Sequence, residues 1–386
     1  MNLFYISPEF PPNFRTFLLR LAQAGVKVWA IGEADFFSMP HELRSSLQWY
    51  KQTNLYDWDS VISSIEFMKT QREDLRTEGL SLTESHNEHW LRLESRINEF
   101  YNLPGIWPKD IDFWKRKSAM KRRMRENNIP VARGELVKSY SHALALIADY
   151  GYPVILKPDE GVGAQSTYCI HSQKELDTIF PSLSGVYILE EFIHGPIVSY
   201  DGLTNQQGEV VFENSLLYSQ GVLSCVEGDD PSFFITRQIP FELSQLGKFL
   251  VNIFQIKKKF FHLEFFKTPN GYIPLEINVR PPGGPILDMM NYSIDGDLYQ
   301  AYSDMILSHP ISLPQEKKYY CGYVGRRNKN YRYSHEKIIQ MYGEHLVQCE
   351  ENPILFQQAM GQYKYIFRTP DLEKLEKMMF HISCKA

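Results

Sequence analysis

Apolar runs and helical spacings alternate along the first part of the chain. Residues 2–6 form a short apolar run that predicts a strand, and Phe14–Ala24 places apolar residues at the spacing of a helix face. A second strand is predicted at 26–31, so the chain opens with a β-α-β unit. Further helices are predicted at 57–70 and 86–100. We therefore predict a small α/β domain over residues 1–112.

Beyond residue 112 the pattern becomes a mixture of strands and helices. A basic helix is predicted at Phe113–Asn127, with five of its cations facing solvent. Strands are predicted at 154–158, 185–189, 197–204, 208–218, 318–324 and 362–367, and helices at 141–150, 172–180, 241–254, 285–308, 334–341 and 371–382. Together the elements predict a fold of the α/β (α+β) class.

The clearest alternation of apolar and polar residues lies in Phe260–Gly284, which predicts a hairpin. One face is apolar (Phe261, Leu263, Phe265, Leu275, Ile277 and Val279) and the other is polar (His262, Glu264, Glu276, Asn278 and Arg280). If Thr268 pairs with Tyr272 across the turn, Glu264 lies directly opposite Glu276. A shift of one residue would move Glu264 to the other face, so this prediction depends on the register.

Two facing carboxylates repel each other unless a cation lies between them. Glu264, Glu276 and Asn278 offer only oxygen ligands, which suit Mg²⁺ or Mn²⁺. The alternative from this stretch alone is an amphipathic hairpin with a solvated polar face. Arg280 extends the polar row, and Pro281–Gly284 ends the strand beside it. A guanidinium next to a metal and an open loop is suited to hold a phosphate or a carboxylate.

A second candidate site begins at the end of the strand predicted at 154–158. Lys157 ends an apolar run, where a partly buried ammonium needs a partner. The loop that follows is rich in small and polar residues, namely Gly161, Gly163, Gln165, Ser166 and Thr167. Such a loop leaves backbone N–H groups free to surround an anion, although most glycine loops are only turns. The lysine and the loop together predict a phosphate site, with a structural turn as the alternative.

A third candidate follows the strand predicted at 185–189. There, acids and apolar residues come in succession as Glu190, Glu191, Phe192 and Ile193. These residues could line a slot for a flat base. The alternative is a strand end whose acids are solvated.

Composition excludes several classes of protein. The formal net charge of −5 and the pI of about 6.2 give no basic surface for nucleic acid. The five cysteines are scattered and form no CxxC pair, so we expect a reducing, cytoplasmic location and neither a disulfide framework nor a zinc site. We expect no secretory signal and no membrane segment, since no apolar run approaches about 18 residues. A G-x-G-x-x-G motif is absent after the first strand, which argues against an NAD site.

Taken in order, these segments resemble the ATP-grasp superfamily, in its carboxylate–amine ligase branch, over residues 1–310. The resemblance implies an ATP-grasp fold with a Rossmann-like N-terminal domain at 1–112. It implies an ATP-grasp domain at 113–310, with a mobile lid over about 120–192. The remaining residues, 311–386, form a C-terminal mixed α/β subdomain in this scheme, and their role is left open.

The resemblance also implies roles for the basic and glycine-rich segments. Lys117 matches a phosphate-binding lysine, with Lys115 and Lys121 as alternatives because Arg116 stands where the family usually has an acid. Lys157 matches the second phosphate-binding lysine. The loop Gly161–Thr167 resembles the mobile cover over the triphosphate.

The remaining matches concern the nucleotide base, the metal and the reacting groups. Glu190–Ile193 resembles the hinge that holds adenine, and Ile197 stands where a ribose-binding glutamate is common. In the hairpin, the residues that match metal ligands are the three already singled out, Glu264, Glu276 and Asn278. Arg280 matches an arginine that faces the transferred phosphate or the substrate carboxylate.

The activity implied is an ADP-forming, Mg²⁺-dependent ligase that uses ATP to join a small-molecule carboxylate, such as an amino acid, to an amine. The intermediate would be an acylphosphate and the product an amide or a peptide. Two alternatives stay open: a carboxylase-type enzyme that activates bicarbonate, and a silent ATP-binding regulatory protein. A homodimer is compatible with the resemblance, and the sequence leaves the oligomeric state, the acyl donor and the amine undefined.

Overall fold

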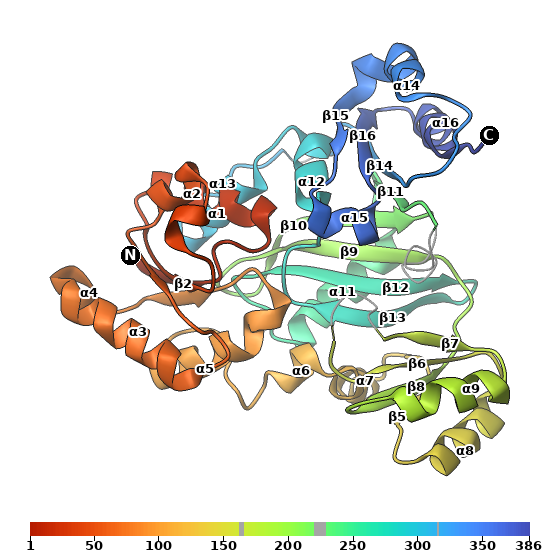
Figure 1. The fold of residues 1–386 in the computed structure, drawn as a ribbon, viewed down its shortest axis with the longest axis horizontal. Helices are drawn as coiled ribbons and strands as arrows, with labels where there is room; N and C mark the ends of the chain where they lie inside the picture. The colour runs from red at the N-terminus through yellow and green to blue at the C-terminus, as the bar shows by residue number, and fades with distance from the viewer. Residues whose placement is uncertain (162–165, 220–228, 315) are drawn as a thin grey trace.

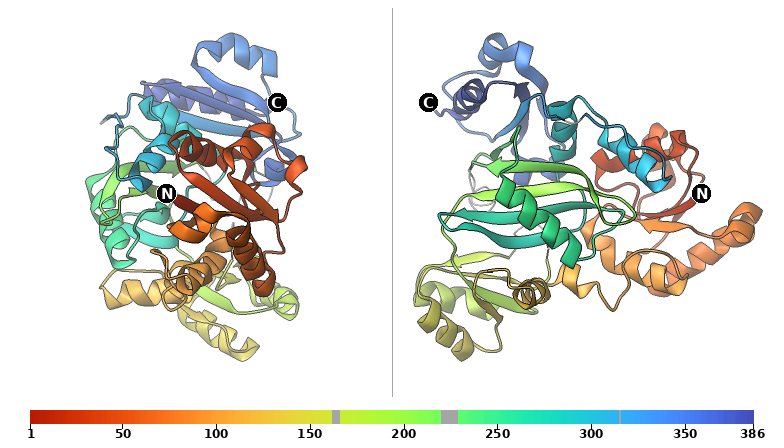
Figure 2. Two further views of the ribbon diagram at one scale, coloured as in Figure 1. Left: turned by 90° about the vertical axis from the view of Figure 1, so that its left-hand side faces the viewer. Right: turned by 180° about the vertical axis from the view of Figure 1, so that it is seen from behind.

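The computed structural model of the protein describes residues 1–161, 166–219, 229–314 and 316–386, and arranges them as three sheets flanked by helices (Figure 1). The N-terminal sheet and its helices lie at one side of the molecule. A small sheet with two helices lies at the opposite lower corner, and the chain ends beside the largest sheet (Figures 1 and 2). The predicted α/β fold class is confirmed.

The N-terminal domain is built on a parallel sheet with the strand order β3-β2-β1-β4. Its strands are β1 (Asn2–Ile6), β2 (Lys27–Gly32), β3 (Trp49–Gln52) and β4 (Leu82–Glu84). Its α-helices are α1 (Arg15–Gln23), α2 (His41–Ser46), α3 (Trp58–Gln71), α4 (Glu73–Glu78) and α5 (Leu91–Phe100), and its 3₁₀ turns are η1 (Pro12–Phe14), η2 (Phe36–Ser38) and η3 (Glu88–Trp90).

Strand β1 is buried along its whole length because helices cover both faces of this sheet. Leu3 and Tyr5 pack in the core that contains α1, while Phe4 and Ile6 pack in the core that contains α3 and α5. The helix predicted at 86–100 begins later than expected, since His86 lies in a loop and Asn87 caps η3.

The second sheet is antiparallel, with the order β5-β8-β6-β7. Its elements are β5 (Gly134–Leu136), α8 (Tyr140–Tyr150), β6 (Val154–Pro158), β7 (Tyr168–Ile170), α9 (Gln173–Ile179), η4 (Phe180–Ser182) and β8 (Tyr187–Glu191). The two helices and the sheet share a core of their own. This unit falls within the predicted lid, whose boundaries and mobility stay predictions.

The central sheet has eight antiparallel strands in the order β13-β12-β9-β10-β11-β14-β16-β15. The strands are β9 (Ile197–Thr204), β10 (Val210–Tyr218), β11 (Ser232–Ile235), β12 (Phe260–Thr268), β13 (Gly271–Asn278), β14 (Tyr320–Arg326), β15 (Leu346–Glu351) and β16 (Tyr363–Thr369). The helices of this part are α11 (Phe241–Ile253), α12 (Ile286–Ile294), α13 (Leu298–Ile306), α14 (His335–Tyr342), α15 (Ile354–Met360) and α16 (Leu372–Ser383), with the turn η5 (Gly343–His345).

Different helices cover the two faces of the central sheet. Helix α11 packs against one face, and α1, α12 and α13 pack against the other (Figures 1 and 2). Strands β14, β15 and β16 lie in the predicted C-terminal subdomain, yet they continue this sheet. The domain boundaries at 112 and 310 therefore stay predictions.

The basic helix predicted at Phe113–Asn127 is wrong as a single helix. The chain forms α6 (Asp112–Lys115) and α7 (Lys117–Glu126), separated by Arg116 in an extended conformation. The backbone N–H of Lys117 donates to the carbonyl of Asp159 across this break, 2.8 Å away. The carboxylate of Asp159 accepts from the N–H and the hydroxyl of Ser118, so Asp159 fixes the start of α7.

Candidate active site

The hairpin β12–β13 places Glu264 directly opposite Glu276, as the sequence predicts. The pairing nearer the turn differs from the predicted pairing. Thr268 pairs with Gly271 rather than with Tyr272, and a β-bulge next to Glu264 then adds one residue to β13. The shift at the turn and the extra residue of the bulge compensate each other, so Glu264 and Glu276 still pair as predicted. Leu275 lies at the bulge and is only half-buried, unlike Ile277 and Val279 of the predicted apolar face.

Each of the two facing carboxylates has a cationic partner from the protein. Glu276 Oε1 lies 2.8 Å from Lys117 Nζ at the start of α7. Glu264 Oε1 lies 3.4 Å from His262 Nε2 on the same strand. Although burial raises the pKa of Glu264, the hydrogen bond and charge of His262 and the charge of Arg280 outweigh it and hold that pKa below its ordinary value. Glu264 is therefore an anion at neutral pH.

His262 is held by a buried acid on the neighbouring strand. Its Nδ1 lies 2.5 Å from Oδ1 of Asp201, and Oδ2 of the same carboxylate accepts hydrogen bonds from Ser199 and Asn214. Burial lowers the pKa of His262, but Asp201 and Glu264 outweigh this effect and raise it to about 9. The imidazolium of His262 thus lies between Asp201 of β9 and Glu264 of β12.

Arg280 contacts an acid that the sequence analysis missed. Its Nε donates to Oε2 of Glu88 over 3.2 Å, and Lys115 Nζ donates to the carbonyl of Glu88 over 2.9 Å. Glu88 is 2% exposed and lies in η3 of the N-terminal domain. The only signal in the sequence would have been an acid near the start of a predicted helix, which is a common and uninformative pattern. Lys115 is thus turned toward Glu88, while Lys117 reaches the hairpin.

Lys157 ends β6, as predicted, and its ammonium lies 3.1 Å from Oε2 of Glu190 on the paired strand β8. Lys121 Nζ lies 3.3 Å from the other oxygen of Glu190. Burial raises the pKa of Glu190, but the two lysines outweigh it and lower that pKa. Glu190 is therefore not a solvated strand end but a buried anion between two lysines.

Lys115, Lys117 and Lys121 are all buried, so the expectation that five of the seven cations in this basic segment face solvent is wrong. Burial lowers the pKa of Lys117, but the charge and hydrogen bond of Glu276 outweigh it and raise that pKa above its ordinary value. Its Nζ also lies 3.5 Å from the carbonyl oxygen of Gly161, where the glycine loop begins. One ammonium therefore joins the loop after β6 to the hairpin.

The rest of the glycine loop is described only in part. Ser166 and Thr167 precede β7, and Ser166 has a left-handed backbone with φ of 55°. Gly163 and Gln165 lie outside the described residues.

Phe192 and Ile193 lie in the connection between β8 of the small sheet and β9 of the central sheet, which is where a hinge would be. Glu191, at the end of β8, pairs with Arg133 through Oε2 at 2.8 Å. Both side chains of the Phe192–Ile193 pair are half-buried.

The donor set on the hairpin fits a hard divalent cation. Glu264, Glu276 and Asn278 present only oxygen atoms, and the two carboxylates face each other. The described residues contain no group of three or more His, Cys, Asp or Glu side chains that could hold a metal, and the set on the hairpin combines two carboxylates with the amide of Asn278.

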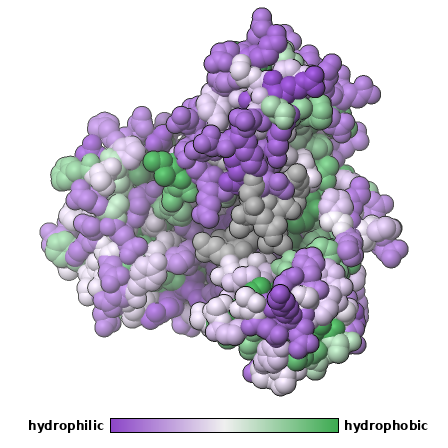
Figure 3. Space-filling model, turned by 45° about the vertical axis from the view of Figure 1, so that its right-hand side comes forward, coloured by the Kyte–Doolittle hydropathy of each residue, from purple (hydrophilic) through white to green (hydrophobic). Residues whose placement is uncertain are grey.

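The face of the molecule in Figure 3 is mostly hydrophilic, with hydrophobic residues in small separate groups. No helix of the described chain is long and apolar enough to cross a bilayer.

Known proteins resemble both the sequence and the fold. The model of the family described as the ATP-binding domain of the carbamoyl-phosphate synthase L chain matches residues 116–190. An L-arginine-specific L-amino acid ligase from Bacillus subtilis is 25% identical over 217 residues, which cover 53% of this chain and 52% of that protein. The crystal structure of an L-amino acid ligase from Bacillus licheniformis superposes with a TM-score of 0.71 at 14% identity, over 98% of this chain and 95% of that one. The chain has the ATP-grasp fold.

A second solved ATP-grasp structure carries ligands. The biotin carboxylase domain of 2-oxoglutarate carboxylase from Hydrogenobacter thermophilus, in complex with MgADP, ADP and bicarbonate, superposes with a TM-score of 0.65 at 13% identity, over 98% of this chain and 88% of that one. The predicted resemblance to ATP-grasp carboxylate–amine ligases is thus confirmed for the fold. The sequence match spans about half of the Bacillus subtilis relative, and the individual site residues stay predictions.

Proposed function

We propose that this protein is an ATP-dependent, ADP-forming ligase that joins the carboxylate of an amino acid to an amine through an acylphosphate. The observation that carries this proposal is the position of Lys117. Its ammonium contacts Glu276 of the hairpin and the carbonyl of Gly161 in the glycine loop. A phosphate between the loop and the hairpin would meet this lysine together with Lys157 and Arg280.

The charges of the candidate site are arranged in pairs before any nucleotide enters. Lys117 is paired with Glu276, Lys157 with Glu190 and Arg280 with Glu88. These carboxylates hold the cations in place inside a buried region. A triphosphate would compete with these carboxylates for the same cations. When it binds, each cation exchanges a carboxylate for a phosphate, and little further desolvation of the lysines is needed.

Glu264, Glu276 and Asn278 would hold Mg²⁺, which when bound supplies positive charge to the phosphates of ATP. The side chains of the protein supply the rest of the positioning. Lys117 and Lys157 offset phosphate charge, and the fork of Arg280 holds the γ-phosphate and the incoming carboxylate close together. Phosphoryl transfer needs mainly this kind of positioning and charge stabilisation.

The reaction has two steps. An oxygen of the substrate carboxylate bonds to the γ-phosphorus, the bond to the bridging oxygen breaks, and ADP leaves. The amine nitrogen then attacks the acyl carbon, phosphate leaves, and the amine gives up one proton. The acylphosphate must be kept from water, which is a physical role for the small sheet over the site.

A second candidate function is the activation of bicarbonate. The biotin carboxylase domain with bound bicarbonate has the same fold, which favours keeping this alternative. The two functions differ in the acyl donor, since a ligase needs an organic carboxylate and a carboxylase needs only bicarbonate.

The test is ADP release with pooled amino acids, with and without an added amine, beside a reaction with bicarbonate alone. The donor is supplied with ¹⁸O in its carboxylate, because an acylphosphate passes one of these oxygens to the released phosphate. The proposal expects labelled phosphate only when an amino acid is present. Turnover with bicarbonate alone would favour the second candidate, and no turnover with any donor would favour a silent protein. The Glu276→Gln variant is the matched control for contaminating ATPase.

A further inference from the structure

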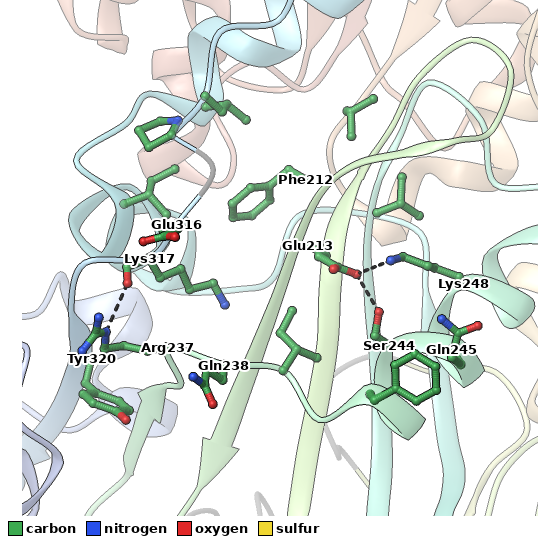
Figure 4. Close-up of a pocket in the computed structure, with 17 residues that line it drawn as sticks. Phe212, Glu213, Arg237, Gln238, Ser244, Gln245, Lys248, Glu316, Lys317 and Tyr320 are labelled. Carbon is green, nitrogen blue, oxygen red and sulfur yellow. Dashed lines mark hydrogen bonds and ion pairs between the residues drawn. The ribbon is translucent and has the colours of Figure 1, made fainter.

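A cavity of about 960 Å³ lies on the central sheet away from the candidate active site (Figure 4). Glu213 of β10 lines it, and this residue faces α11, where it contacts Ser244 and Lys248. The neighbouring Asn214 points to the other face of the sheet, where it donates to Asp201 beneath His262. The cavity thus lies at the edge of β10, where Glu213 reaches it from the face covered by α11 and Phe212 reaches it from the other face.

The cavity opens along an edge of β10 that pairs with no other strand among the described residues. Strand β11 pairs with β10 only at Leu216–Tyr218, and the N–H of Thr236 extends this pairing to Ser215. Residues Val210–Asn214 pair with β9 on one side and have no strand on the other side within the described residues. Such an edge can accept the backbone of an added peptide.

Lys317 brings a cation into the cavity from the segment before β14, and Figure 4 shows its side chain extending toward β10. Its Nζ donates to the carbonyl of Thr236 over 3.1 Å, and it forms no ion pair with any described residue. An ammonium has three donors, so two remain for a ligand. Burial lowers the pKa of Lys317 to about 8, against the opposing charges of Asp201 and Glu213. An anion next to Lys317 would offset this cost of burial.

Glu213 provides the opposite charge on the far side of the cavity. Three donors converge on its Oε2, namely the hydroxyl of Tyr200 at 2.7 Å, the hydroxyl of Ser244 at 2.9 Å and Nζ of Lys248 at 3.0 Å. None of the described residues donates to its Oε1. Burial raises the pKa of Glu213, but these three partners outweigh it, so the residue stays ionised at neutral pH. Its free oxygen can accept from a ligand ammonium.

We propose that this cavity binds a short peptide with free termini, of two or three residues. Its carboxylate would contact Lys317, its ammonium would contact Oε1 of Glu213, and its backbone would lie along the open edge of β10. Apolar side chains of the peptide would pack against the apolar lining, which includes Phe212, Ile239 and Phe241. The volume is larger than a single amino acid fills, and a ligand without an ammonium would leave Oε1 of Glu213 without a donor from the described residues. The proposal does not rest on the proposed function, because no cavity residue belongs to the candidate active site.

The test uses the full chain without nucleotide and the dipeptide L-leucyl-L-leucine in titration calorimetry. We expect binding that weakens at least tenfold when the amino terminus is acetylated or the carboxyl terminus is amidated. Lys317→Met should weaken binding at least tenfold, and Phe241→Ala, at a side chain that is 73% exposed, should weaken it several-fold. Lys318→Met is the matched control, since Lys318 is exposed and paired with Asp295, and it should leave binding unchanged.

A second measurement on the wild-type protein keeps the test independent of how the variants fold. Acetylation of Lys317 is followed by mass spectrometry, with Lys318 as the internal reference. Saturating dipeptide should slow the modification of Lys317 at least fivefold and leave Lys318 unaffected. Equal binding of the blocked dipeptides, wild-type binding by Lys317→Met, absence of any heat at millimolar dipeptide, or unprotected Lys317 would each overturn the proposal. Loss of ligase activity would leave these readouts unchanged, so the two proposals fail separately.

Discussion

Two clusters of buried charge differ in whether their oxygen atoms are already satisfied. Lys259, just before β12 of the central sheet, lies 2.5 Å from Oε1 of Glu84 and 2.7 Å from Oε1 of Glu94. Glu84 lies in β4 and Glu94 in α5. Tyr302 donates to the other oxygen of Glu84, and Ser85 donates to the other oxygen of Glu94. All four carboxylate oxygens therefore have a donor from the protein.

On the hairpin of the candidate active site, by contrast, one acid keeps an oxygen without a donor. Glu276 contacts Lys117 through Oε1, and no described residue donates to its Oε2. Its side chain is also 19% exposed, whereas those of Glu84 and Glu94 are 1% exposed. Buried charge alone therefore does not mark a functional site. The free oxygen of Glu276 is what distinguishes the hairpin from the cluster of Lys259, Glu84 and Glu94.

The largest effect on stability should come from breaking the cluster of Lys259, Glu84 and Glu94. Lys259→Met leaves two buried carboxylates without their cation, so we expect a loss of about 3–5 kcal/mol in the free energy of unfolding. Denaturant unfolding measures this loss, and Lys258→Met, at a neighbour without an ion pair, should change stability by less than about 0.5 kcal/mol. A loss below about 1 kcal/mol for Lys259→Met would contradict the structural role given to this cluster.

The next effect concerns turnover rather than stability. Arg280→Lys removes the bidentate fork but keeps the charge opposite Glu88, so ATP affinity should stay within a few-fold while turnover falls about 10²-fold. Calorimetry and amine-dependent ADP release on the same variant measure the two quantities. Arg20→Lys, at an exposed pair with Asp297, should change neither. Preserved turnover in Arg280→Lys would show that Arg280 is not at the reacting phosphate.

The affinity for ATP should depend on Lys157, near the end of β6. Lys157→Ala removes one charge-assisted contact to phosphate, so ATP binding should weaken by about 1.5–3 kcal/mol. Lys174→Ala, at an exposed lysine of α9, is the control on the same small domain. Unchanged ATP affinity by calorimetry would make Lys157 a purely structural partner of Glu190.

The last prediction is a pH dependence of stability in the cluster of Lys259, Glu84 and Glu94. Burial and the charge of Glu84 raise the pKa of Glu94 to about 7, against the opposing charge of Lys259. A raised folded-state pKa means that the contribution to stability is present below the ordinary pKa and is lost as the pH rises toward 7. Relative to wild type, Glu94→Gln should therefore gain stability between pH 5 and 7.5, with a slope of at most about 1.4 kcal/mol per pH unit. Parallel stability profiles of the two proteins would rule this titration out.

Alternating side chains made the hairpin the most predictable part of the molecule. A slip of one residue would have put Glu264 in the apolar core, so burial of Phe261, Leu263 and Phe265 fixes the face on which it lies. The position of the turn was less predictable because local turn geometry and a β-bulge can compensate each other. Leu275 shows this, since it follows the apolar pattern in sequence yet lies at the bulge.

Long-range contacts were beyond what the sequence pattern could predict. Lys115, Lys117 and Lys121 follow one another on a basic stretch, yet each meets a different acid, and the break at Arg116 separates Lys115 from the two lysines of α7. That break depends on Asp159, which lies far along the chain and carries no local signal. Glu88 was missed for the same reason, because its partners come from two other parts of the fold.

The most direct test of the catalytic role of the hairpin is ADP release by Glu276→Gln, with the amino acid and amine that support the fastest wild-type turnover. Glutamine keeps the shape of the side chain and removes the charge that faces Glu264. We predict that the variant unfolds at a temperature close to that of wild type while its amine-dependent ADP release falls by about 10²-fold or more. Wild-type ADP release by the double variant Glu264→Gln, Glu276→Gln would contradict the assignment of this face as the active site.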